Sequence, residues 1–137
     1  MTVSSIKSLK TPLRYPGGKS RACKKMDPYI PDLRDYDSYY EPFLGGGSVA
    51  IHITKKYPHL KINVSDLYEP LYNFWVCLQK RGEQMAGELN KLKSSHSTPD
   101  LAKELFLESK KIINDEDKGR LDRAIAFYIV NKCSFSG

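Results

Sequence analysis

A glycine-rich turn is the part of this sequence whose residues most clearly predict a ligand site. Gly45, Gly47 and Ala50 fit the pattern G-x-G-x-x-G/A. In this pattern the first glycine turns the chain, the second lets a ligand approach the backbone, and the small third residue lets a helix and a strand pack closely. Asp66 lies twenty-one positions after Gly45, where a carboxylate commonly accepts hydrogen bonds from ribose hydroxyls. These residues together predict a site for a ligand that contains adenosine.

Glu41 stands directly before the glycine turn and indicates which ligand of this class fits. In dinucleotide-binding proteins the helix after such a turn receives a pyrophosphate, and a carboxylate beside it would be repelled. S-adenosyl-L-methionine carries an ammonium and a sulfonium group and no phosphate. Glu41 therefore favours S-adenosyl-L-methionine as the cofactor, and a nicotinamide dehydrogenase is the less favoured alternative.

The residues around the turn predict the elements that hold it in place. Residues 39–43 have the composition of a strand, residues 48–57 continue as a helix, and residues 61–66 alternate as a second strand. Strand, helix and strand form a βαβ unit, in which the strands are parallel and the crossover is right-handed. The predicted fold class is α/β, with a partial parallel sheet.

Helices without glycine turns or strands are predicted for the rest of the chain. They cover residues 67–79, 83–93, 98–113 and 120–132. The change in pattern predicts two parts, a cofactor-binding part over residues 1–80 and a helical part over residues 81–137.

The net charge of +6 lies entirely in the N-terminal quarter of the chain. Residues 1–34 contain eight Lys or Arg and two Asp, whereas the remaining residues contain equal numbers of each sign. Such a cluster is typical of a surface that binds phosphate, although a merely solvated surface is an equal alternative.

Several classes of protein and site are disfavoured. No apolar run approaches the roughly 20 residues that a membrane helix needs, and the N-terminus has no hydrophobic signal-peptide core. The three cysteines and three histidines show no spacing typical of a metal site or a disulfide framework. We therefore expect a cytoplasmic protein without a membrane anchor or a metal.

Three motifs resemble the Dam-type, or alpha-group, DNA adenine methyltransferases, which methylate the exocyclic amino group of adenine. Residues 12–20 read PLRYPGGKS, residues 40–49 read YEPFLGGGSV and residues 64–67 read VSDL. Residues 123–137 are similar to the family's Asn-Arg-x-x-Phe-x-Gly stretch, with Lys132 in place of the usual Arg. The resemblance implies a Rossmann-like methyltransferase nucleus, S-adenosyl-L-methionine as cofactor, and double-stranded DNA as substrate of a monomeric enzyme in a bacterial cell or a phage-infected host.

The resemblance also implies roles in cofactor binding. Tyr15 and Lys19 would flank the methionine end of S-adenosyl-L-methionine, with the Lys ammonium facing its carboxylate. Asp66 would bind the ribose. The remaining pocket residues implied by the family are Glu41, Phe43, Gly45 and Gly47.

Three further residues are implied to lie near DNA. Arg14 would approach the DNA backbone. Residues 81–137 would begin the target recognition domain, with Asn131 and Lys132 near its DNA-facing end.

The catalytic motif of the family, Asp-Pro-Pro-Tyr, does not occur in these 137 residues. In the family this motif holds the amino nitrogen of a flipped-out adenine and follows the recognition domain. The resemblance therefore implies that the chain corresponds to the N-terminal part of such an enzyme, contains none of its catalytic residues and transfers no methyl group alone. A non-catalytic module that binds nucleic acid or the cofactor is the alternative.

Overall fold

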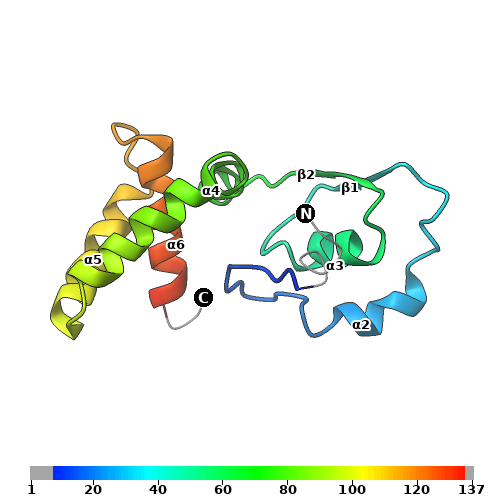
Figure 1. Cartoon of the computed structure of the whole chain (residues 1–137), viewed down its shortest axis with the longest axis horizontal. Coiled ribbons are helices and arrows are strands. Elements are labelled where there is room, and N and C mark those ends of the chain that lie inside the picture. The colour runs from blue at the N-terminus through cyan, green and yellow to red at the C-terminus, as the bar shows by residue number, and fades with distance from the viewer. Residues whose placement is uncertain (1–7, 135–137) are drawn as a thin grey trace. The chain divides into compact units, whose positions relative to one another are not determined.

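Helices and two short strands make up the computed structural model, which describes residues 8–134 and divides into two compact units, Met1–Asp66 and Leu67–Gly137. The elements of the first unit are α2 (Cys23–Met26), the 3₁₀ turn η1 (Asp27–Tyr29), β1 (Ser38–Glu41), α3 (Ser48–Lys56) and β2 (Lys61–Val64) (Figure 1). Those of the second unit are α4 (Glu69–Ser95), α5 (Pro99–Ile112) and α6 (Arg120–Cys133). Lys7 of the cationic cluster and residues 135–137 of the stretch that is similar to the family lie outside the described residues.

The predicted strand–helix–strand unit is confirmed within the described residues. β1 and β2 pair in parallel, with Ser38 opposite Lys61 and Glu41 opposite Val64, and α3 connects them. β1 ends at Glu41, two residues earlier than predicted. The reason is that the next residue, Pro42, has no N–H to donate to a ladder. The result is a mixed α/β architecture with a small parallel sheet.

α3 packs on one face of this sheet and forms the core of the first unit. Ile53, Tyr57 and Leu60 are buried there, and Tyr39 and Ile62 from the two strands pack against them. Because side chains alternate between the two faces of a strand, Glu41 projects from the same face of β1 as Tyr39.

In the second unit α6 packs against both α4 and α5. The ring of Phe74 on α4 stacks on Tyr128 at 6.0 Å between centroids and lies 5.6 Å from Phe127. The side-chain amide of buried Asn73 donates to the carbonyl of Arg120, 2.9 Å away, at the start of α6. Aromatic packing and a satisfied buried amide therefore join α4 to α6.

α4 contains both of the helices predicted for residues 67–79 and 83–93. They are separated by a kink at Arg81, where φ is −138° and ψ is 32° and the backbone is not helical. Gly82 follows directly, and glycine has a low helix propensity and often marks a kink. The kink coincides with the boundary predicted at residue 80, whereas the two compact units divide before α4, between Asp66 and Leu67.

Candidate cofactor site

A tight turn forms the first part of the candidate site. The N–H of Gly18 donates to the carbonyl of Tyr15 at 2.9 Å. Pro16 occupies the second position of this turn, and Gly17 occupies the third with a φ of +69°. This is the arrangement of a type II β-turn, in which proline presets the second position and glycine tolerates the positive φ of the third.

Tyr15 lies directly on the glycine turn that follows β1. A Cβ added at Gly46 would lie 2.7 Å from the Cβ of Tyr15, and one added at Gly45 would lie 3.2 Å from its Cε1. The hydroxyl of Thr11 donates to the carbonyl of Gly46. The structure therefore brings two motifs that are distant in the sequence into one surface.

The glycine turn itself needs glycine at two of its positions. The φ angles of Gly45 and Gly47 are +54° and +78°, in the left-handed region that side chains disfavour. The N–H of Gly47 donates to the carbonyl of Leu44 at 3.0 Å, and α3 begins at the next residue, Ser48.

Asp66 is linked to this turn by a direct hydrogen bond. The backbone N–H of Gly45 donates to Oδ2 of Asp66 at 2.9 Å. A carboxylate accepts several hydrogen bonds at once, so the bond to Gly45 is compatible with a second bond to a ligand hydroxyl.

Glu41 is half-buried beside Tyr39 and interacts electrostatically with Lys19. The Tyr39 hydroxyl donates to Oε2 of Glu41 at 3.2 Å. Burial raises the pKa of Glu41, while this hydrogen bond and the Lys19 ammonium act in the opposite direction. Burial, aided by the Glu41 charge, also raises the pKa of Tyr39 to about 12, so Tyr39 stays protonated at neutral pH and can donate.

The residues of this site differ in exposure. Phe43 is 85% exposed and presents an aromatic ring after β1. Lys19 and Arg14 are exposed in the segment that carries the tight turn. The structure thus brings Tyr15, Gly45, Gly46 and Asp66 into one connected cluster. Gly47 follows in the same turn, and Glu41 lies at the end of β1.

Tyr39 was not predicted as a site residue, although the sequence contains a signal for it. Tyr39 and Glu41 are two positions apart on a strand, and such residues share a face. The core residues around the Tyr39 ring fix it in place, so its hydroxyl orients the Glu41 carboxylate.

We expect Tyr39→Phe to weaken binding of S-adenosylmethionine most strongly at mildly acidic pH. The ring and its core contacts remain, but Glu41 loses the hydrogen bond that lowers its pKa. The pKa of Glu41 then rises, and the pH below which the carboxylate is neutral moves upwards. Calorimetric affinities of both proteins across a pH series would show this shift, whereas a uniform loss at every pH would contradict it.

We expect Gly46→Ala to lower the free energy of unfolding of the first unit by about 1–3 kcal/mol, since the added methyl group overpacks against Tyr15. Gly87→Ala on α4 is the matched control. A Cβ there meets no atom within 4 Å, and alanine in a helix stabilises by about 0.5–1 kcal/mol relative to glycine. Amide hydrogen exchange in α3 and α4 measures both effects; equal effects at the two glycines would contradict the packing.

Asn131 and Lys132, predicted to lie near DNA, are both on α6 in the second unit. Asn131 is only 8% exposed. The Lys132 ammonium lies 5.5 Å from the centroid of the Tyr128 ring, an ordinary cation–π distance. A role for these residues in DNA binding stays a prediction.

Residues 8–134 contain neither a group of side chains suited to a metal ion nor a helix that could span a membrane. No group of three or more His, Cys, Asp or Glu side chains in that range could hold a metal ion. Over the same residues, no helix has the length and apolar character needed to cross a membrane.

Comparison with known proteins gives the family of the chain. The Type II methyltransferase M.MjaIII of Methanocaldococcus jannaschii is 27% identical over 135 residues, which cover 91% of this chain and 46% of that protein. The chain therefore spans less than half the length of this curated relative. Residues 15–137 match the D12 class of N6 adenine-specific DNA methyltransferases, which confirms the resemblance seen in the three motifs. The chain belongs to the D12 class N6 adenine-specific DNA methyltransferase family.

Proposed function

We propose that this protein takes part in the methylation of the exocyclic amino group of adenine at specific sites in double-stranded DNA, and that its first unit binds S-adenosyl-L-methionine. Family membership supports the reaction. The observation that carries the cofactor assignment is the cluster in which Tyr15 packs on Gly45 and Gly46 and Asp66 accepts the Gly45 N–H.

The charges at the site fit the two ends of the methionine part of the cofactor. The cofactor supplies a methyl group already activated by its bond to a sulfonium sulfur. Glu41 provides a half-buried carboxylate for the ammonium group, and Lys19 provides a cation for the carboxylate group. The opposite charges of these two residues act on each other, which supports a site for a zwitterion.

The remaining residues of the first unit are assigned to the nucleoside end. Asp66 accepts hydrogen bonds from ribose hydroxyls, and its bond to Gly45 holds the carboxylate against the turn. The exposed ring of Phe43 offers a flat apolar surface beside it. Gly45 and Gly47 give the turn its positive φ angles, and the missing Cβ of Gly45 leaves room for the ring of Tyr15.

The roles of the two parts of the chain are assigned from the family resemblance. The parallel strand pair is assigned to a Rossmann-like methyltransferase nucleus, residues 1–80 to its cofactor-binding part and residues 81–137 to the start of the target recognition domain. Arg14, Asn131 and Lys132 are assigned to DNA. We further propose, from the family resemblance, a monomeric enzyme in the cytoplasm of a bacterial cell or a phage-infected host, in a restriction–modification role.

Calorimetric titration of the 137-residue protein with S-adenosylmethionine and with NAD tests the cofactor assignment. We expect binding of the first and none of the second. Asp66→Ala should weaken binding by about 10- to 100-fold, since a hydrogen bond to a charged group contributes about 1.5–3 kcal/mol. The matched control is Asp100→Ala, an exposed carboxylate in the first turn of α5, which should leave the affinity unchanged. Tight binding of NAD would overturn the assignment.

A further inference from the structure

A cationic helical turn follows Lys19, and its cations Arg21, Lys24 and Lys25 have no assigned role in cofactor binding. The Lys19 carbonyl accepts the N–H groups of Ala22 and Cys23 at 2.9 Å each, and the Ala22 carbonyl accepts that of Met26 at 3.0 Å. The helical hydrogen bonding therefore begins before α2 and includes residue 21.

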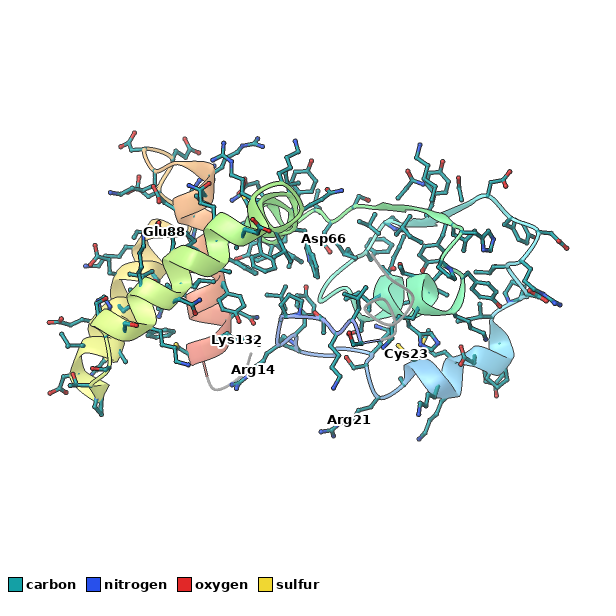
Figure 2. The ribbon with its side chains drawn as sticks, in the orientation of Figure 1. Arg14, Arg21, Cys23, Asp66, Glu88 and Lys132 are labelled. Atoms are coloured by element: carbon teal, nitrogen blue, oxygen red, sulfur yellow. The ribbon has the colours of Figure 1, made fainter. Side chains whose placement is uncertain are left out.

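Three cations share the outer face of this turn. Arg21, Lys24 and Lys25 stand at positions i, i+3 and i+4, which are neighbours on a helix surface, and all three are exposed. Figure 2 shows Arg21 extending away from the ribbon. On the other side, Cys23 is buried and its thiol lies 3.8 Å from the carbonyl of Ser48 on α3.

The turn is fixed to the first unit on both sides of Arg21. The hydroxyls of Ser20 and Ser48 are 2.7 Å apart, and Cys23 anchors the next turn against the same residue. The backbone that carries the three cations is therefore held in a fixed position against α3.

No carboxylate compensates these charges. Residues 8–26 contain no Asp or Glu. The next acid along the chain is Asp27, whose Oδ1 lies 2.7 Å from Nε2 of His52 and 3.5 Å from Nζ of Lys56. Among the ion pairs of the described residues, none includes Arg21, Lys24 or Lys25. Like charges at this spacing are mildly destabilising, so an anionic partner would relieve their repulsion.

We propose that Arg21, Lys24 and Lys25 form a contact surface for the phosphate backbone of double-stranded DNA, in addition to Arg14. The proposal rests on the proposed function, which makes DNA the substrate. Lysine and arginine contacts to phosphates position a protein on DNA without reading its sequence. A lipid surface fits less well, because a helix that lies on a membrane needs an exposed apolar face, and the buried Cys23 side of this turn packs against α3.

The test measures binding of a fluorescent duplex by anisotropy at several salt concentrations. The variant is Arg21→Gln, Lys24→Gln and Lys25→Gln, which keeps long side chains with good helix propensity. The matched control is Lys56→Gln, Lys61→Gln and Lys80→Gln, which removes three exposed charges from α3, β2 and the first part of α4.

We expect the variant to flatten the slope of log affinity against log salt by about 2.7, because each phosphate contact contributes about 0.9. Between 50 and 200 mM salt, the affinity of the unmodified protein should then fall about 40-fold more than that of the variant. The control should keep the original slope. An unchanged slope in the variant, an equal change in the control, or a charge-dependent binding to anionic lipid vesicles without binding to the duplex would each overturn the proposal.

Titration of the same variants with S-adenosylmethionine separates the two proposals. Unchanged cofactor affinity together with an unchanged salt slope would overturn the phosphate contact alone. A flattened slope in a protein that binds no S-adenosylmethionine would support the phosphate contact while overturning the cofactor site.

Discussion

Glu41→Gln is expected to lower the affinity for S-adenosylmethionine by about 10- to 100-fold, the effect of losing a charge-assisted hydrogen bond of about 1.5–3 kcal/mol. Glutamine keeps the size of the side chain and can still accept the hydrogen bond of Tyr39. What it loses is the negative charge that faces the ammonium end of the cofactor. Calorimetric titration of both proteins at neutral pH measures the difference.

The same substitution should leave the fold as stable or more stable at neutral pH. Burial raises the pKa of Glu41 above its ordinary value, so the folded state disfavours the ionised carboxylate. The contribution of Glu41 to stability is therefore complete below its ordinary pKa and is lost as the pH rises through its folded pKa. Glutamine does not titrate, so over that rise in pH the stability of the variant increases relative to that of the unmodified protein.

Urea unfolding at acidic and neutral pH measures this gain, and Glu104→Gln, an exposed carboxylate on α5, is the control that should change neither property. If Glu41→Gln instead lost affinity and stability together at neutral pH, the carboxylate would have a structural role and the assignment to the cofactor would be wrong.

Phe74→Ala is expected to reduce the free energy of unfolding of the second unit by about 3–5 kcal/mol, as for other buried phenylalanines. Phe74 is 1% exposed, and it contacts the rings of Trp75, Phe127 and Tyr128. Its removal leaves a cavity between α4 and α6. Because Trp75 is the single tryptophan of the chain, its fluorescence during urea unfolding reports on this unit.

Leu107→Ala on α5 is the control for this prediction. Leu107 is 48% exposed, and substitutions at such positions usually change the stability by less than about 0.5 kcal/mol. A similar loss from both substitutions would contradict the central place of Phe74 in the core.

The sequence predicted the parts of the fold that depend on local patterns. The positive φ angles of Gly45 and Gly47 are a conformation that few residues other than glycine adopt, and the glycine pattern in the sequence predicted the turn. The parallel pairing of β1 and β2 follows from a strand, a helix and a strand in succession. These features were predictable because each is fixed by neighbouring residues.

Contacts between distant segments could not be predicted in the same way. The packing of Tyr15 on Gly46 joins residues that are far apart in the chain, and no local pattern encodes it. The family resemblance suggested that both segments approach the cofactor, but only the structure gives their direct contact. The break between the helices predicted for residues 67–79 and 83–93 was, by contrast, placed correctly, since the backbone at Arg81 between them is not helical.

The helical spacing of Asn131 predicts burial, whereas the family resemblance implied a position near DNA. Ala124, Phe127 and Asn131 are separated by three and four positions on α6, the spacing of a single helix face, and all three are buried. Helical spacing alone would have placed Asn131 in the core of the second unit.

A map of backbone amide shifts in the nuclear magnetic resonance spectrum, recorded as S-adenosylmethionine is added, tests the cofactor site most directly. The cluster of Tyr15, the glycine turn and Asp66 predicts that the largest shifts occur at the non-proline residues of 15–19 and 41–47 and at residue 66, with small shifts in α5. Shifts confined to the second unit, or no shifts at millimolar cofactor, would contradict the assignment of the first unit as the cofactor site.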